Sequence, residues 1–281
     1  MAHLGRIISL PPPAKATFQH TLPGATDSDP SPFRSNPPSV STIVESVLPS
    51  PLTNLHLTKG LQHSDGLVQH VTALTLARAL EKLELVQKLF RDIEAELEAE
   101  PGSSAESPWA RRSRELEMEC RKRVPDVLVV IAFAQKSATL ARVNPDSADE
   151  PDQALLAKST MLTESALRLF ELYYRALPSI PSEVKFDIGK LLVSASSAKA
   201  ERREWREARA GSVISDTGSV RSVGTVGTAG MGGGFGHARG DVIGFEALSQ
   251  AHVLSLLSQV REWNWSGKAG MSLYMEDSSQ A

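Results

Sequence analysis

This sequence of 281 residues has few cysteines, few aromatic residues and a small net charge. Cys120 is the single cysteine, which excludes an intrachain disulfide and a cysteine-rich zinc module and favours a reducing compartment such as the cytosol or nucleus. Aromatic residues make up 5% of the chain, which favours packing of Leu- and Ala-rich helices over a β-sandwich. The formal net charge of -3 gives no global attraction to nucleic acid or to an anionic membrane, so such a contact needs a local patch.

Long apolar runs are absent as well. The first residues, "MAHLGRIISLPPPAKA", hold an apolar run that three prolines end, and this run is too short for the core of a signal peptide. No run approaches the roughly 20 apolar residues that span a bilayer. We therefore expect no membrane among the partners.

Catalytic and metal-binding motifs are missing too. The glycine-rich "GGGFGHARG" at 232–240 lacks the Lys-Ser/Thr of a phosphate-binding loop and is typical of a flexible linker. No HExxH or GxSxG sequence occurs, and Cys120 has no histidine near it in the sequence. His56, His63 and His70 recur every seven residues, but a turn separates them, so they predict structural or surface roles. We expect no enzyme activity, cofactor, metal ion or small-molecule substrate.

Changes in composition predict the organisation of the chain. Apolar residues recur at helical spacing in most of it, and segments rich in Pro, Ser or Gly separate these stretches. The predicted parts are a disordered Pro/Ser-rich N-terminus at 1–39, a helical-repeat domain at 40–200, a charged and then Gly/Ser-rich disordered linker at 201–240, a further helix of the same domain at 241–268 and a tail at 269–281. The predicted fold class is therefore all-α.

The clearest predicted helix follows "HSDG" at 63–66, a helix stop in which Ser64 or Asp65 can cap the next helix. It continues to about Glu100 without glycine or proline, and we expect its first half to be buried on two sides. The apolar stripe that predicts its buried face comprises Leu67, Val71, Leu74, Ala77 or Arg78, Leu85, Leu89 and Ile93.

The apolar run "VLVVIAF" at 127–133 fits a buried strand by residue propensity. Its "VPD" start and its helical surroundings favour a buried helix instead. The segment "LTKGLQHSDGLVQHVTALTLARALEKL" combines a short helix, a tight polar turn and a longer helix, and it resembles one HEAT-type repeat. Later helices keep no fixed period, so we predict an irregular α-solenoid of HEAT/armadillo-like antiparallel helix pairs with disordered insertions.

Two basic clusters are the candidate binding features. Both are interleaved with Glu, which is typical of a solvated face of salt bridges, and the alternative is a stripe that contacts the phosphates of a large RNA assembly. The first cluster comprises Arg111, Arg112, Arg114, Arg121, Lys122 and Arg123. The second comprises Lys199, Arg202, Arg203, Arg206 and Arg209.

Five blocks, in this order, resemble the N-terminal domain of the nucleolar pre-ribosomal-associated protein 1 family, fungal type. They are "SPLTNLHLTKGLQHSDGLVQHVTALTLARALEKL", "RKRVPDVLVVIAFAQ", "LTESALRLFELYYRALP", "KFDIGKLL" and "SQAHVLSLLSQVREWNWSGKAG". The first block is the most specific, and the resemblance covers residues 36–268. Family members are far longer, so we interpret the chain as a fragment or a truncated member.

The resemblance implies an irregular helical-repeat scaffold, without catalytic residues, in the nucleolus of the nucleus. It implies association with early pre-60S ribosomal particles and their proteins, including an RNA helicase, and with rRNA or small nucleolar RNA. A different hypothesis is a generic helical-repeat adaptor that binds proteins and has no RNA role.

Overall fold

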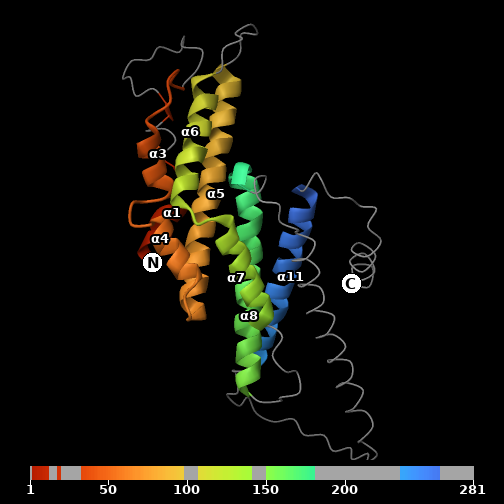
Figure 1. The fold of residues 1–281 in the computed structure, drawn as a ribbon. Coiled ribbons are helices and arrows are strands. Elements are labelled where there is room, and N and C mark those ends of the chain that lie inside the picture. Colours follow the sequence, from red (N-terminus) through yellow and green to blue (C-terminus); the bar gives the residue numbers. More distant parts are fainter. Residues whose placement is uncertain are drawn as a thin grey trace, which may run out of the picture. The chain divides into compact units, whose positions relative to one another are not determined.

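A computed structural model describes residues 2–12, 18–19, 33–97, 107–140, 150–180 and 235–259. Within these ranges the regular elements are α-helices, accompanied by an isolated β-bridge between Gln19 and Phe33. The helices are α1 (Ala2–Ser9), α3 (Val40–Val47), α4 (Asn54–Leu61), α5 (Gly66–Leu97), α6 (Pro108–Arg123), α7 (Val127–Leu140), α8 (Glu150–Ala176) and α11 (Phe235–Gln259) (Figure 1). The all-α class is thus confirmed for the described part of the chain, and the solenoid arrangement stays a prediction. None of these helices is long and apolar enough to cross a membrane.

The chain divides into two compact units. Unit 1 comprises Met1–Phe133 and Arg168–Lys185, and unit 2 comprises Ala134–Leu167 and Phe186–Ala281. The division falls inside α7 and inside α8, so the described part of unit 1 holds α1 to α6 with the adjoining ends of those two helices.

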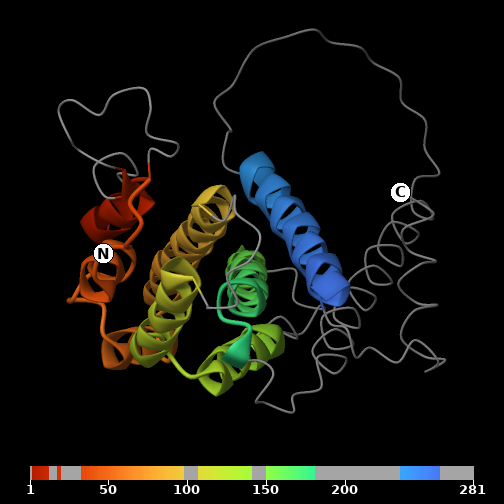
Figure 2. The ribbon, with the colours of Figure 1, turned by 90° about the horizontal axis from the view of Figure 1, so that it is seen from above.

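Helix α5 is the centre of unit 1. It packs against α1, α3, α4 and α6, and α6 also packs against α3. Figure 2 shows α6 beside α5 in the view from above. Four apolar side chains of α5 are fully buried, those of Ala73, Leu76, Leu80 and Leu83. The polar Thr72 and Thr75 beside them are buried too. The expectation that the first half of α5 is buried on two sides is therefore confirmed.

The predicted apolar stripe of α5 is only partly right. Ala77 and Ile93 are buried, but Leu67 and Leu85 are 65% and 58% exposed. The buried face instead includes the polar Gln69, whose Nε2 donates a 3.0 Å hydrogen bond to the carbonyl of Leu61. Because several helices surround α5, their positions decide which face is buried, and the apolar spacing of one helix does not contain that information.

The turn "HSDG" separates α4 from α5 as predicted. Asp65 is the capping residue, since its Oδ1 accepts a 2.8 Å hydrogen bond from the backbone N–H of Leu67. The two helices then approach closely at Gly60, where an added Cβ would lie 2.7 Å from Cγ2 of Thr72. Glycine at this position allows α4 to rest directly on α5.

The prediction of disorder throughout residues 1–39 is wrong for part of that range. Residues Ala2–Ser9 form α1, which packs against α5, and Ile8 and Phe18 are each 1% exposed. The ring of Phe18 meets Phe90 and Trp109 edge to face, with centroids 5.7 Å and 6.0 Å away. An eight-residue helix ends before the three prolines at 11–13, so those prolines do not prevent it.

The remaining helices confirm some predictions and correct others. The run 127–133 is helical, as part of α7, and not a strand. Helix α11 begins at Phe235, so the end of the predicted 201–240 linker is helical, and no proline lies there to prevent a helix. The rest of that linker, the range 181–200 and the tail at 269–281 lie outside the described residues.

Helix α11 contacts α8 within unit 2. On α11, Val253 and Leu256 are buried, and Nε2 of His252 lies 3.4 Å from Oε1 of Glu164 on α8. Glu164 is itself only 5% exposed.

Candidate nucleic-acid interface

Helix α6 carries the first basic cluster, and the residues at its two ends determine where the helix begins and ends. Ser107 caps the N-terminus, where its Oγ accepts 3.2 Å hydrogen bonds from the backbone N–H groups of Trp109 and Ala110. Pro108 occupies the first turn, where its missing N–H costs nothing. The last turn is Arg121 to Arg123, whose positive charges complement the negative end of the helix dipole.

The buried face of α6 is narrow and apolar. It consists of Trp109, Leu116 and Cys120, which are at most 1% exposed. The indole Nε1 of Trp109 donates a 3.1 Å hydrogen bond to the carbonyl of Arg34. Burial raises the pKa of the Cys120 thiol to about 12, so the side chain remains a neutral thiol and the predicted lack of a nucleophilic role is consistent with its position.

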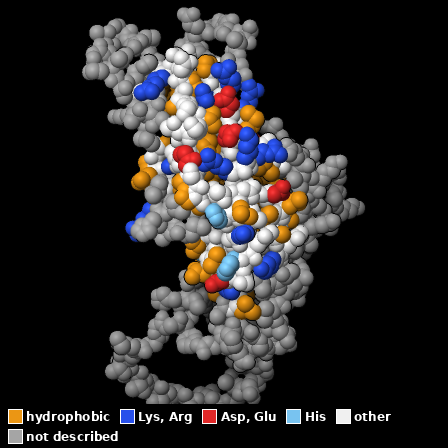
Figure 3. All heavy atoms as spheres, turned by 60° about the vertical axis from the view of Figure 1, so that its left-hand side comes forward, with side chains coloured by type: hydrophobic (Ala, Val, Ile, Leu, Met, Phe, Trp, Pro, Cys, Tyr) orange, Lys and Arg blue, Asp and Glu red, His pale blue; other side chains and the backbone are white. Residues whose placement is uncertain are grey.

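The basic residues of α6 lie beside the glutamates with which they are interleaved. Nη1 of Arg112 is 3.0 Å from Oε2 of Glu115, and Nε of Arg111 is 4.0 Å from Oε1 of the same residue. Nζ of Lys122 is 2.6 Å from Oε1 of Glu119. Arg114 and Arg121 also take part in interactions. Figure 3 accordingly shows acidic side chains set among the Lys and Arg side chains on one face of the molecule.

Arg123 differs from the others because its partners lie outside α6. Its Nη1 donates to Oε1 of Glu45 on α3 at 2.7 Å and to the carbonyl of Leu48 at 2.9 Å. The other carboxylate oxygen of Glu45 accepts from both the N–H and the Oγ of Ser50, each at 2.8 Å. The hydrogen bond from Arg123, followed by that from Ser50, holds the pKa of Glu45 below its ordinary value.

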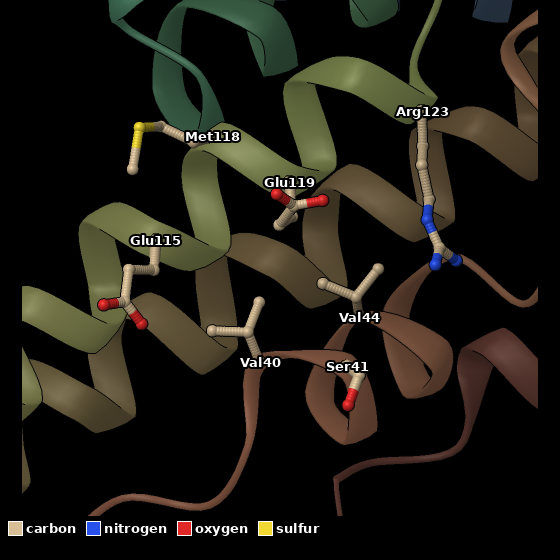
Figure 4. Close-up of a pocket in the computed structure, with 7 residues that line it drawn as sticks. All are labelled: Val40, Ser41, Val44, Glu115, Met118, Glu119 and Arg123. Atoms are coloured by element: carbon tan, nitrogen blue, oxygen red, sulfur yellow. The ribbon is translucent and has the colours of Figure 1, made fainter.

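A shallow groove of about 330 Å³ lies between α3 and α6, beside this ion pair. Val40, Ser41 and Val44 line it from α3, and Glu115, Met118, Glu119 and Arg123 line it from α6. Figure 4 shows Val40 and Val44 on the α3 side, with Arg123 at one end of the row. Its α3 wall offers the apolar side chains of Val40 and Val44, and its α6 wall offers carboxylates together with Arg123, so the groove can contact a partner peptide.

The three histidines do not form a metal site. Nδ1 of His56 lies 3.0 Å from Oγ1 of Thr53, which is the N-cap of α4. Nδ1 of His63 accepts a 3.0 Å hydrogen bond from the backbone N–H of Asp65. Both side chains thus make hydrogen bonds at the ends of α4, which agrees with the predicted structural role of these histidines. In the described residues no group of three or more metal-ligating side chains gathers.

Sequence reasoning identified the cations of α6 but missed Glu45 and Ser50. These residues precede Arg123 by more than 70 positions, and no spacing rule links them to it. The second basic cluster, Lys199 to Arg209, lies outside the described residues. The structure therefore places only the first cluster on a defined helix.

Comparisons of this chain with protein-family models, with curated proteins and with solved structures gave no match. The described ranges define the protein as an all-helical one, in which a helix rich in paired charges lies at the surface of unit 1.

Proposed function

We propose that this chain is a non-catalytic scaffold in early assembly of the large (60S) ribosomal subunit. In the nucleolus it organises assembly factors, among them an RNA helicase, together with pre-rRNA or small nucleolar RNA on pre-60S particles. The proposal starts from the resemblance of its sequence blocks to the N-terminal domain of nucleolar pre-ribosomal-associated protein 1.

The observation that carries the proposal is that three of these blocks pack against one another in unit 1. Nδ2 of Asn54, in the first block, donates a 2.8 Å hydrogen bond to the carbonyl of Val124 in the second. The hydroxyl of Tyr173, in the third block, donates a 2.9 Å hydrogen bond to the carbonyl of Pro125. Nη2 of Arg168 lies 2.6 Å from Oε1 of Glu81, which joins the third block to the first. The resembling blocks thus contact one another within one folded unit.

The α4–α5 hairpin supports the finer proposal of an irregular α-solenoid. A HEAT-type repeat needs two antiparallel helices that pack closely behind a short turn. Here the turn is capped by Asp65, and Gly60 permits close contact with Thr72. The hydrogen bond from Gln69 to the carbonyl of Leu61 also satisfies the end of the shorter helix.

The alternative, a protein-binding adaptor without an RNA role, is favoured by the charge pairing on α6. The helix carries six basic and three acidic residues, so its net charge is +3. Arg112, Lys122 and Arg123 nevertheless contact carboxylates, which lowers their attraction for phosphate. RNA binding through α6 therefore requires these surface pairs to exchange partners.

Sedimentation of the tagged chain in cell extract tests both functions. The scaffold proposal expects the chain in the fractions of pre-60S particles, and expects this co-sedimentation to be lost after RNase treatment. Exclusion of the chain from the nucleus under the microscope would contradict the proposal. Association with a protein partner that resists RNase, without pre-60S particles, would instead support the adaptor.

A further inference from the structure

Ser50 is an exposed serine in the connection between α3 and α4, and proline follows it in the sequence. Serine followed by proline is the minimal recognition element of proline-directed protein kinases. Ser107 in the described residues shares this element, but its Oγ caps α6 and the next residue after Pro108 is the buried Trp109. Of these two serines, Ser50 is therefore the one that a kinase can reach without opening the core.

The surroundings of Ser50 contain both a carboxylate and a cation. Oε2 of Glu45 accepts from the N–H and Oγ of Ser50 at 2.8 Å, while Oε1 accepts from Nη1 of Arg123 at 2.7 Å. The serine hydroxyl and the guanidinium thus lie on the two oxygens of one carboxylate. Arg121 and Lys122 belong to the same last turn of α6 as Arg123.

We propose that Ser50 is a phosphorylation site and that its phosphate takes Arg123 from Glu45. A proline-directed kinase transfers the γ-phosphoryl group of ATP to Oγ of Ser50, which loses its proton, and ADP leaves. The inference does not depend on the proposed role in ribosome assembly.

The physical basis is the change in hydrogen bonding and charge at Oγ. Phosphorylation removes the hydrogen that Oγ donates to Glu45, and it places a charge of about -1.5 to -2 beside that carboxylate. Two anions side by side then compete for one guanidinium. A phosphate can bind arginine through two parallel hydrogen bonds, whereas Glu45 accepts one hydrogen bond, from Nη1 of Arg123.

The consequence concerns the contact between α3 and α6. Arg123 now joins these helices through Glu45 and the carbonyl of Leu48. After phosphorylation it joins α6 to the α3–α4 connection instead, and Glu45 turns to solvent. Arg123 lines the groove and holds Glu45 by an ion pair, so the modification changes the charge that a partner in that groove meets.

The full chain, treated with a proline-directed Ser/Thr kinase and ATP, tests the site directly. Mass spectrometry is expected to find phosphate on Ser50, and Ser50→Ala is expected to remove it while leaving any phosphate on Ser107. Absence of phosphate on Ser50 under conditions that modify a peptide of the same sequence would overturn the proposal.

Phosphorus NMR of the phosphorylated chain tests the exchange of partners. Phosphoserine ordinarily has a second pKa of about 6, and contact with Arg123 is expected to lower it by about half a unit or more. Arg123→Gln should remove most of that shift, and Arg123→Lys should keep part of it, since it retains charge but loses the paired donors.

Arg111→Gln is the matched control, because this arginine lies on the same helix about 18 Å away along its axis at 1.5 Å per residue. It should leave the phosphorus titration unchanged. Circular dichroism on each variant checks that the helix content of the chain is retained. An equal pKa in the native chain, in Arg123→Gln and in the urea-unfolded chain would refute the exchange of partners.

Discussion

Substitution of Gly60 by alanine tests the close approach of α4 and α5. The added Cβ would lie 2.7 Å from Cγ2 of Thr72 and in contact with its Oγ1, both of which are closer than real Cβ contacts allow. Thr72 is 1% exposed, and its Oγ1 donates to the carbonyl of Val68 at 2.7 Å. Because a β-branched side chain on a helix has few alternative rotamers, α4 must move away from α5.

Two opposing effects set the magnitude. Alanine is favoured over glycine inside a helix by about 1 kcal/mol. Overpacking a filled site costs about 1–3 kcal/mol, and here it also separates the buried Leu57 and Leu61 from α5. The cost of the clash less the gain in helix propensity is a net loss, and we expect the free energy of unfolding of unit 1 to fall by up to about 2 kcal/mol.

Amide hydrogen exchange, followed by mass spectrometry on peptides from α4 and α5, measures this loss. The double variant Gly60→Ala/Thr72→Ala should recover most of it, because the second substitution removes both clashing atoms. Gly244 is the matched control: it lies exposed in α11 with nothing within 4 Å of an added Cβ. Gly244→Ala should therefore slow exchange in α11. If Gly60→Ala stabilises the α4–α5 pair as Gly244→Ala stabilises α11, the close approach is wrong.

Three further predictions concern buried side chains of unit 1. Phe18→Ala should lower the free energy of unfolding by about 3–5 kcal/mol in urea titrations, because the ring packs edge to face on Phe90, and no change would mean that the N-terminal segment is not docked. Tyr173→Phe should cost about 1–3 kcal/mol in the same titration, since it leaves the buried carbonyl of Pro125 without this donor. Cys120 should resist alkylation at pH 8 until the chain is unfolded. Because its pKa is raised from 9.0 to about 12 on folding, stability should fall as pH rises above 9, as the unfolded state loses the proton first; alkylation of the native chain would refute this.

Helix starts and stops were predicted well from the sequence, because they depend on neighbouring residues. Examples are the helix stop at "HSDG", the long helix without glycine or proline after it, and the start of α6 at Ser107-Pro108. The prediction for 127–133 also succeeded, because its helical surroundings outweighed β-propensity. Composition was a poorer guide at the N-terminus, where Phe18 is buried despite the prolines around it.

Burial and pairing could not be predicted in the same way, because they depend on residues distant in sequence. Leu67 and Leu85 lie on the predicted stripe yet are exposed, whereas Gln69 is buried and its side-chain N–H donates a hydrogen bond to the carbonyl of Leu61. In the candidate site, the Glu pairing within α6 follows from the i,i+3 and i,i+4 spacing. The pairing of Arg123 with Glu45 follows only from the packing of α6 against α3.

The cations of α6 should consequently differ in what they do for RNA and for stability. The side chains of Arg111 and Lys122 are 67% and 68% exposed, so their pairs with glutamate contribute only about 0–1 kcal/mol and exchange readily for phosphate. Arg123 is 33% exposed and also holds the carbonyl of Leu48. If α6 contacts RNA, Arg111→Gln/Lys122→Gln should reduce the salt dependence of binding in fluorescence anisotropy by a slope of about 1–2 without changing the urea midpoint. Arg123→Gln should lower the urea midpoint whether or not RNA binds. An unchanged urea midpoint for Arg123→Gln would show that the ion pair with Glu45 does not form.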